Sequence, residues 1–438
     1  MVQGRLSTRS PNLGSRRARV VDALADHAVP LGTVDPTAGL ADLDPFREAF
    51  ADERIVGLGE STHGTREFFR LKHRLVRFLV EELDFRLFAW EANVATTTAL
   101  DEYVRTCTGD PAEVLANETV HWPWRSEAVL DLIEWLRAFN EGRTADDQVR
   151  FHGLDVQYPT DAAAELRSYL SAVDPDALDE VGEDLTRLVE TDPVSLPREE
   201  TGDLLETAGR VAATLAELFE ERAAAYVDAS SDDEFERARR HRWTLAKSAE
   251  RADSDDTLGF RDEAMAAQVE WILDHEPADR VVLWGHNAHV RRGAVAGGNA
   301  DTDASALGEH LRREYGDDYY PVALEFARGA VRVHSLWANE FEDREVTAPP
   351  AESLPDYLDD LDESPVFVDL ESAAANSDVG RWLARGPGFH RVVGSHRGDS
   401  VSYADGDPAD GFDAVAFVQE STPTTPTERV LPELDLGG

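Results

Sequence analysis

Seven short apolar runs, separated by segments with helical spacing, dominate the sequence and restrict the folds open to it. They occupy residues 54–60, 86–91, 149–155, 280–287, 320–326, 365–370 and 412–418. Between the first two runs, apolar residues recur every three or four positions from Phe68 to Leu83, which predicts an amphipathic helix. Strand, helix and strand in this order are typical of a parallel α/β unit. The sequence therefore predicts an α/β fold with a central, mostly parallel sheet flanked by helices.

A large helical insertion interrupts this α/β rhythm. From about residue 159 to residue 259 the chain is rich in Ala, Leu and Glu and contains no strand-like run. We expect the insertion to form either a cap over the sheet edge or a separate helical lobe. We place one α/β domain, including the insertion, at residues 19–420. The polar stretches on either side predict a disordered segment at 1–18 and a flexible tail at 421–438.

The composition is strongly acidic, with 87 Asp and Glu residues against 43 Lys and Arg and a formal net charge of −44. Such a surface repels phosphate backbones and anionic lipids, so we expect neither a nucleic-acid nor a membrane partner. Lys72 and Lys247 are the only lysines, and this Arg-dominated acidic composition resembles that of salt-accumulating halophiles. We find no signal peptide and no apolar run of the roughly 20 residues that span a bilayer, which predicts a cytoplasmic protein.

Four of the apolar runs end in side chains capable of chemistry. These are Glu60, Glu91, Asp155, and His286 with Asn287. The carboxyl ends of parallel strands gather at one edge of a sheet, which is where α/β proteins place their ligand sites. We therefore expect the functional site at this edge.

The segment GLGESTHGTREF, residues 57–68, contains the first candidate pair, Glu60 and His63. A carboxylate beside an imidazole fixes its tautomer and raises its basicity, as a general base that activates water requires. The alternative interpretation is a helix N-cap formed by Ser61 or Thr62, with His63 packed nearby. The residues alone favour the two interpretations equally.

The segment LWGHNAHV, residues 283–290, brings His286 and His289 close together after an apolar strand. Two imidazoles at this spacing can bind one metal ion, with His63 or Glu91 completing the ligand set. They can also act without a metal, one of them holding a substrate oxygen. A polar turn with a purely structural role is the third interpretation.

Arginine supplies a further candidate in FRDEAMAAQVEWIL, residues 260–273, where Arg261 stands in the predicted first turn of a helix. It could bind a carboxylate or stabilise negative charge that develops in a transition state. For Lys72, Arg66 and Arg74, on the helix after His63, we expect a solvated or ion-paired face. The sequence contains no GxGxxG, no phosphate-binding P-loop and no GxSxG, so nucleotide binding and covalent serine chemistry lack their usual motifs.

Five blocks in this order resemble the erythromycin esterase family: residues 57–92, HWPWRSEAVLDLIEWLRAFN, VRFHGLDVQ, FRDEAMA and VVLWGHNAHV. The resemblance extends from about residue 55 to residue 418, excepting the helical insertion. It implies an α/β core with helical additions, and a hydrolase that opens a macrolactone ester with water, without a covalent intermediate. It also implies a role in the response to macrolide antibiotics.

Carried over by motif, the resemblance implies a role for each candidate residue. His63 is the general base, Glu60 supports it, and Glu91 shares the site. His286, His289 and Arg261 bind or polarise the lactone carbonyl and stabilise the oxyanion.

The resemblance implies no cofactor and a small ester or lactone as the substrate. The family is also distantly similar to haem-binding lipoproteins and Tiki-type metalloproteases. A metal- or haem-binding protein, or a metal-dependent hydrolase, is therefore the alternative. A non-catalytic binding protein is the third.

Overall fold

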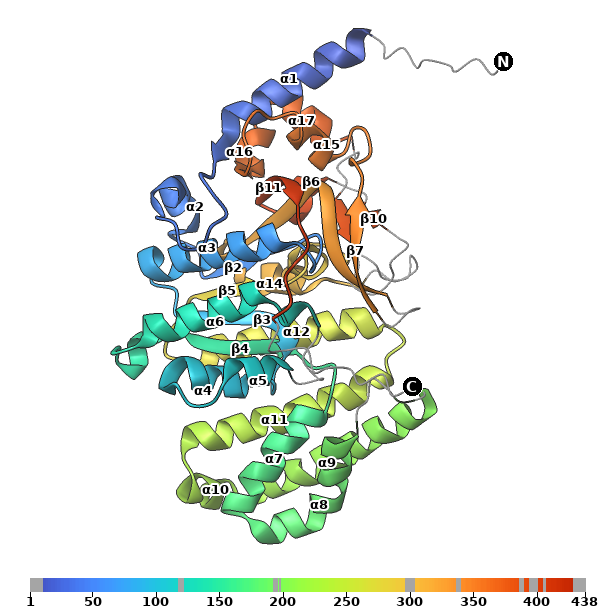
Figure 1. Cartoon of the computed structure of the whole chain (residues 1–438). Coiled ribbons are helices and arrows are strands. Elements are labelled where there is room, and N and C mark those ends of the chain that lie inside the picture. The colour runs from blue at the N-terminus through green and yellow to red at the C-terminus, as the bar shows by residue number, and fades with distance from the viewer. Residues whose placement is uncertain are drawn as a thin grey trace, which may run out of the picture. The chain divides into compact units, whose positions relative to one another are not determined.

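The computed structural model describes residues 11–116, 122–191, 196, 198–295, 304–335, 340–385, 390–393, 401–404 and 407–427. The chain divides into two compact units (Figure 1). The first contains Met1–Leu83, Gly285–Gly297 and Arg312–Thr424, and the second contains Asp84–Trp284, Gly298–Leu311 and Thr425–Gly438. Each unit is therefore assembled from segments that are far apart in the sequence.

Strands of the first unit pair in the order β1-β8-β11-β6-β2, and β7 pairs with β6. Their bounds are β1 (Ala28–Pro30), β2 (Ile55–Leu58), β6 (Tyr319–Ser335), β7 (Glu340–Val346), β8 (Val366–Asp369) and β11 (Ala414–Ser421). Strand β6 is parallel to both β2 and β11, with Ile55 opposite Tyr319 and Ala414 opposite Val322. The other pairs are antiparallel. A separate antiparallel pair joins β9 (His390–Val393) to β10 (Val401–Ala404).

Helix α1 packs against helices that come from the C-terminal part of the first unit. Val20 and Leu24 of α1 share one buried core with Leu354 and Trp382. This unit contains α1 (Pro11–His27), α2 (Arg47–Phe50), α3 (Arg66–Leu83), α13 (Asn287–Val290), α15 (Leu354–Leu358), α16 (Leu370–Ala374), α17 (Ser377–Leu383) and α18 (Pro408–Gly411). Arg17 adds ion pairs to Asp356 and Asp360, both at 2.5 Å. The N-terminal helix is thus held by both apolar burial and charge.

Three parallel strands form the sheet portion of the second unit, in the order β5-β3-β4. They are β3 (Leu87–Asn93), β4 (Arg150–Asp155) and β5 (Val281–Trp284), and every residue of β3 and β5 is buried. The accompanying helices are α4 (Thr98–Thr106), α5 (Pro111–Ala116), α6 (Glu127–Asn140) and α12 (Thr257–His275), and α14 (Leu307–Tyr315) begins in this unit. Helices α4 and α12 both pack on β4. This burial explains why β3 and β5 read as continuous apolar runs.

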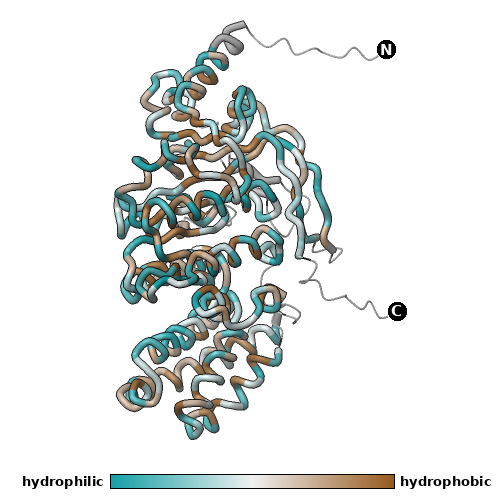
Figure 2. The backbone as a smooth tube through the Cα atoms, turned by 60° about the vertical axis from the view of Figure 1, so that its left-hand side comes forward, coloured by the Kyte–Doolittle hydropathy of each residue, from teal (hydrophilic) through white to brown (hydrophobic). Residues whose placement is uncertain are grey.

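The predicted insertion is helical and falls within the second unit. It consists of α7 (Thr160–Val173), α8 (Pro175–Glu190), α9 (Arg198–Glu221), α10 (Ala223–Ala229) and α11 (Asp232–Ala252). Asp174 and Ser231 accept hydrogen bonds from the first turns of α8 and α11, which fixes where these helices begin. Figure 2 shows hydrophobic and hydrophilic residues alternating along these helices, and the apolar ones form a shared core.

The structure confirms the predicted fold class, a mixed and mostly parallel sheet with flanking helices and a large helical insertion. The chain ends differ from expectation. Helix α1 begins at Pro11, within the segment expected to be disordered, and residues 1–10 lie outside the described residues. Ser421, Thr424 and Thr427 are buried, although the tail was expected to be flexible from residue 421; residues 428–438 are not described. Among the described helices, none combines the length and apolar composition of a membrane span.

Candidate active site

Glu60 lies just after β2, in a segment whose backbone stays bonded to β6. The N–H groups of Gly59 and Ser61 donate to the carbonyls of Val322 and Leu324, at 2.8 and 3.1 Å. A Cβ atom on Gly59 would lie 2.1 Å from the side-chain oxygen of Asn287, so only glycine permits this approach. The GLGE sequence therefore brings the end of β2 against the turn that contains His286.

Both oxygens of the Glu60 carboxylate are engaged by charged or polar partners. Oε1 lies 2.5 Å from His63 Nδ1, and Oε2 lies 2.9 Å from Lys72 Nζ. Glu60 and Lys72 are fully buried, and His63 is 6% exposed. The Lys72 ammonium also donates to the carbonyl of Gly285 at 3.1 Å. The buried lysine stabilises Glu60 as an anion, and that anion favours the His63 tautomer with its proton on Nδ1 and its lone pair on Nε2.

His286 lies next to this pair and has a defined tautomer of its own. Its Nδ1 accepts a hydrogen bond from the Ala288 N–H at 3.1 Å, as the N-cap of α13. A neutral His286 must therefore hold its proton on Nε2, which makes that nitrogen a donor. The rings of His63 and His286 are 5.0 Å apart between centroids and tilted by 60°. One imidazole can thus accept a proton while its neighbour donates a hydrogen bond.

Asn287 fixes the turn that holds His286, because its backbone and side chain bind two different segments. The backbone N–H of Asn287 donates to the carbonyl of Glu60 at 2.8 Å. Its side-chain amide donates to the carbonyl of Leu324 at 3.1 Å and to the carboxylate of Glu325 at 3.2 Å. His289, two residues further along α13, is buried. The α13 turn is therefore attached to both the end of β2 and to β6.

Arg261, Glu91 and Asp155 form a second cluster, which lies in the second unit. The Arg261 guanidinium contacts Glu91 at 2.8 Å and Asp155 at 2.7 Å. Burial favours the neutral form of Asp155, but the charge and hydrogen bonds of Arg261 prevail and lower the pKa of the Asp155 carboxyl. The two carboxylates likewise raise the pKa of Arg261 against the opposing effect of burial. Helix α12 begins at Thr257, so Arg261 lies one turn further into the helix than predicted.

The structure thus groups the predicted residues by unit. Glu60, His63 and His286 lie together in the first unit with His289 on the same short helix, and Glu91 and Arg261 lie together in the second. Of the two interpretations of the GESTH segment, the structure shows the contact between Glu60 and His63. Thr62 Oγ1 accepts a hydrogen bond from the Gly64 N–H at 3.1 Å, but α3 begins only at Arg66, so this bond does not cap the helix.

Sequence reasoning missed two residues of the first cluster, Lys72 and Glu325. Lys72 was expected on a solvated or ion-paired face, and the structure shows the ion pair but no solvent exposure. A signal for Lys72 was available, because a chain that uses arginine almost everywhere retains lysine at only two positions. Glu325 lies near the end of the apolar run at residues 320–326, and this position could have flagged it.

The donor groups of the first cluster are committed to one another rather than arranged around an ion. Lys72 and His63 engage the two oxygens of Glu60. In the described part of the chain, no group of three or more His, Cys, Asp and Glu side chains has a geometry that could hold a metal ion.

Comparisons with known proteins identify relatives of the chain. The model of the erythromycin esterase family matches residues 80–421, well over half of the chain, and begins after Glu60 and His63. Erythromycin esterase type II of Escherichia coli is 22% identical over 331 residues, which cover 70% of this chain and 77% of that protein.

Two solved structures share the fold. A crystal structure of a Bacillus cereus protein has a TM-score of 0.80 and 25% identity, and covers 94% of this chain and 99% of that one. An erythromycin esterase mutant in its open conformation has a TM-score of 0.66 and 17% identity, and covers 90% and 98%. The chain belongs to the erythromycin esterase family, and this membership indicates a hydrolase.

Proposed function

We propose that the protein hydrolyses a carboxylic ester or lactone with a water molecule that His63 activates. The observation that carries this proposal is the buried chain of contacts Lys72–Glu60–His63, at 2.9 and 2.5 Å. It favours a lone pair on His63 Nε2, and it stabilises the positive charge that the ring gains when it takes a proton. Family membership supports hydrolysis as the reaction class.

In the proposed reaction, His63 Nε2 removes a proton from water as the water oxygen attacks the carbonyl carbon. The carbonyl π electrons move onto oxygen and give a tetrahedral oxyanion. Collapse of this intermediate breaks the bond to the leaving oxygen, which takes the proton from His63. The products are a carboxylic acid and an alcohol, or one hydroxy acid from a lactone, and the histidine returns to its neutral form.

His286 is the proposed donor to the oxyanion. Its Nδ1 accepts the Ala288 N–H, so its Nε2 holds a proton, and its ring lies 5.0 Å from that of His63. A donor placed in advance where negative charge develops stabilises a transition state more than it stabilises the substrate. The place of Glu91 in the site, and the roles of Arg261 and His289 in binding or polarising the carbonyl, stay predictions from the family resemblance.

The substrate class rests on the relatives. One curated relative is named as an erythromycin esterase, and a lactone of this type supplies a carbonyl that water can attack without a charged leaving group. We therefore propose a macrolactone or another neutral ester as the substrate. If the substrate is a macrolide, the protein would act in the response to macrolide antibiotics, and we include this role in the proposal.

The test is hydrolysis of a panel of macrolides and simple esters by the wild-type protein and by His63→Ala, each with and without a chelator. His27→Ala, at the end of α1, is the matched control for loss of a histidine. We expect turnover that resists the chelator, survives in the control and falls by roughly 10²- to 10⁴-fold in His63→Ala. Turnover that His63→Ala retains would refute the assigned base, and loss of activity with the chelator would refute the metal-independent mechanism.

A further inference from the structure

The second unit contains a cavity of about 830 Å³ that the proposed reaction does not use. Residues of β4, α4, α7, α11 and α12 line it, among them Arg150–Gly153 of the strand. Its volume falls within the roughly 300–1,000 Å³ range typical of sites for small molecules. None of the residues assigned above to ester hydrolysis lines it. The cavity therefore calls for an explanation of its own.

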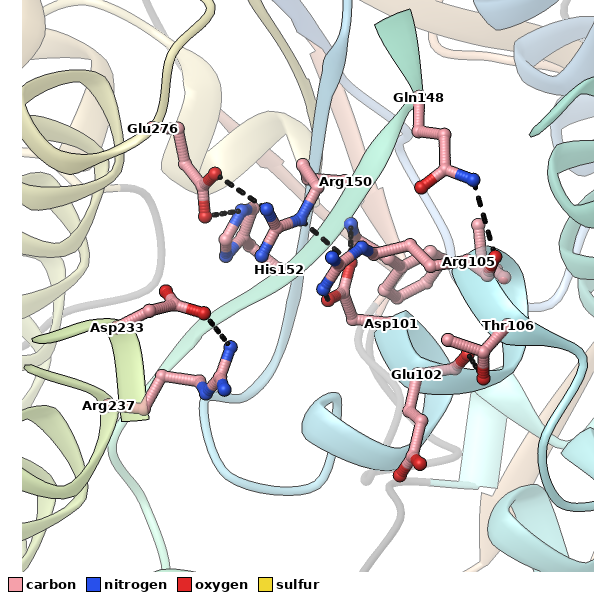
Figure 3. A network of polar contacts seen from close by, with 12 residues as sticks. Asp101, Glu102, Arg105, Thr106, Gln148, Arg150, His152, Asp233, Arg237 and Glu276 are labelled. Carbon is pink, nitrogen blue, oxygen red and sulfur yellow. Dashed lines mark hydrogen bonds and ion pairs between the residues drawn. The ribbon is translucent and has the colours of Figure 1, made fainter. Parts of the chain in front are cut away.

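Most charged side chains that line the cavity are paired with one another. Figure 3 shows Glu276 between Arg150 and His152, both at 3.2 Å, and Arg237 beside Asp233 at 2.7 Å. These pairs neutralise one another, so they leave little local charge for a ligand to meet.

Arg240 is the exception among the lining arginines. It is 8% exposed, its Nε donates to Gln268 Oε1, and its Nη2 donates to the Ala267 carbonyl at 3.3 Å. Its guanidinium stacks on Trp243, 3.3 Å from the ring centroid. Within the described residues, no carboxylate forms an ion pair with Arg240 and its Nη1 has no acceptor. Glu270 acts on Arg240 through its charge alone, without a hydrogen bond. A buried guanidinium with an unbonded N–H is unfavourable unless something else accepts it.

Two further polar side chains of the cavity wall lie beside this cation. His241 is 6% exposed, and among the described residues its buried Nδ1 has no hydrogen-bond partner. Gln268 is 1% exposed and also lines the cavity. Burial, with Arg237 and Arg240 nearby, lowers the pKa of His241 to about 4, so the ring is neutral near pH 7. Burial also lowers the pKa of Arg240 to about 9, against the opposing charge of Glu270.

We propose that Arg240, with His241 and Gln268, binds the carboxylate group of a small organic molecule in this cavity. A carboxylate adds a counter-charge in direct contact and accepts the unbonded N–H of the guanidinium. Asp232 and Glu234 of α11 also line the cavity, outside these pairs, and disfavour ligands with more than one negative charge, such as phosphate. Trp271 and Tyr169 supply apolar surface for the rest of the molecule.

The test is isothermal titration of the full chain with benzoate and acetate, with inorganic phosphate and neutral benzamide as contrasts. We expect benzoate to bind more tightly than acetate, and phosphate and benzamide to bind more weakly than either. In Arg240→Met the affinity for benzoate should fall roughly tenfold to a hundredfold, as expected when a charge-assisted hydrogen bond is lost. Arg210→Gln removes an exposed arginine of α9 outside the cavity, and it should bind benzoate like the wild type.

A second variant separates ligand binding from a purely structural role of Arg240. Gln268→Glu places a carboxylate where Gln268 already accepts from Arg240 Nε, so it should mimic the ligand. We expect it to raise the thermal midpoint of the free protein and to abolish benzoate binding. Arg240→Met removes the contacts of the guanidinium with Gln268 and Trp243 together with its charge, so its thermal midpoint is measured to show that the variant folds.

Three results would overturn the proposal. They are no benzoate or acetate binding up to about 10 mM, phosphate binding more tightly than benzoate, or Arg240→Met binding benzoate as the wild type does. These outcomes do not bear on ester hydrolysis, which is measured separately through His63.

Discussion

Replacing Lys72 with methionine tests the charge arrangement that the proposed mechanism requires. Lys72 and Glu60 are both fully buried, with 2.9 Å between Nζ and Oε2. Methionine retains most of the lysine volume but removes the ammonium, so the packing around α3 is largely preserved. The change leaves Glu60 with its contact to His63 and without its cationic partner.

The expected loss of stability follows from this burial. Removing one partner of a buried ion pair typically costs about 3–5 kcal/mol, because the remaining charge has neither water nor a counter-ion. Glu60 can avoid part of this cost by taking up a proton, but a neutral Glu60 no longer supports His63 as a base. We therefore expect Lys72→Met to lower the free energy of unfolding by about 3 kcal/mol or more. Ester hydrolysis should fall by about 10²-fold or more.

Chemical denaturation and ester hydrolysis are measured on Lys72→Met, Glu60→Gln and the double variant. Removing both charges should restore stability to within about 1 kcal/mol of the wild type, because no uncompensated charge remains. Activity should stay low in the double variant, since His63 still lacks an anionic partner. Lys247→Met is the matched control, because the only other lysine forms a partly exposed pair with Glu250 and should contribute under about 1 kcal/mol.

The reasoning would be refuted by either of two results. One is a Lys72→Met variant that loses no more stability than Lys247→Met. The other is a double variant that remains as unstable as the single one, since the loss would then come from packing rather than charge.

Three further predictions concern charge elsewhere in the chain. Burial and the carboxylates of Asp413 and Asp318 raise the pKa of Glu53 from 4.5 to about 7. Between these two pH values the folded protein holds a proton that the unfolded chain releases, so the free energy of unfolding falls as pH rises from 4.5 to about 7. After allowance for partial exposure, Glu53→Gln should therefore raise the free energy of unfolding by about 1–2 kcal/mol at pH 8 and by almost nothing at pH 4. An equal rise at both pH values would contradict this prediction. The net charge of −44 predicts a thermal midpoint that rises between low and molar potassium chloride. Salt shortens the screening length from about 10 Å at 0.1 M to about 3 Å at 1 M, which weakens the repulsion between carboxylates. An unchanged midpoint would count against this prediction. Arg261→Met leaves Glu91 and Asp155 buried without their cation. Denaturant titration should show a free energy of unfolding lower by about 3–5 kcal/mol. A loss under about 1 kcal/mol would show that the two carboxylates are protonated or hydrated instead.

The strands could be predicted from the sequence because burial on both faces leaves a local mark. Every residue of β3 and β5 is buried, and their apolar stretches Leu87–Trp90 and Val281–Trp284 are followed closely by Glu91 and His286. The helical insertion was equally visible in its composition. What the sequence did not contain was the pairing of strands, since β6 lies beside both β2 and β11, which are far from it in the chain.

The candidate site could be predicted as a set of residues but not as a set of contacts. Glu60 and His63 are neighbours in sequence, so their contact could be inferred from spacing. The partner of Glu60 on its other side, Lys72, lies on the middle of α3, where helical periodicity alone cannot distinguish a buried cation from a solvated one. Arg240 was missed for a similar reason, because a basic residue in a charged helix reads as surface until its neighbours in space are known.

The packing of α1 and β1 also sets an order for folding during synthesis. Strand β1 pairs with β8, and Val20 and Leu24 are buried against residues near 354 and 382, so the N-terminal segment meets these partners more than 300 residues later. At a translation rate of about 5–20 residues per second, the interval is on the order of tens of seconds. During that time its apolar face is open to chaperones or to other nascent chains. A slower ribosome would lengthen this exposure without changing the native state, so the yield of folded protein should depend on the expression host more than its stability does.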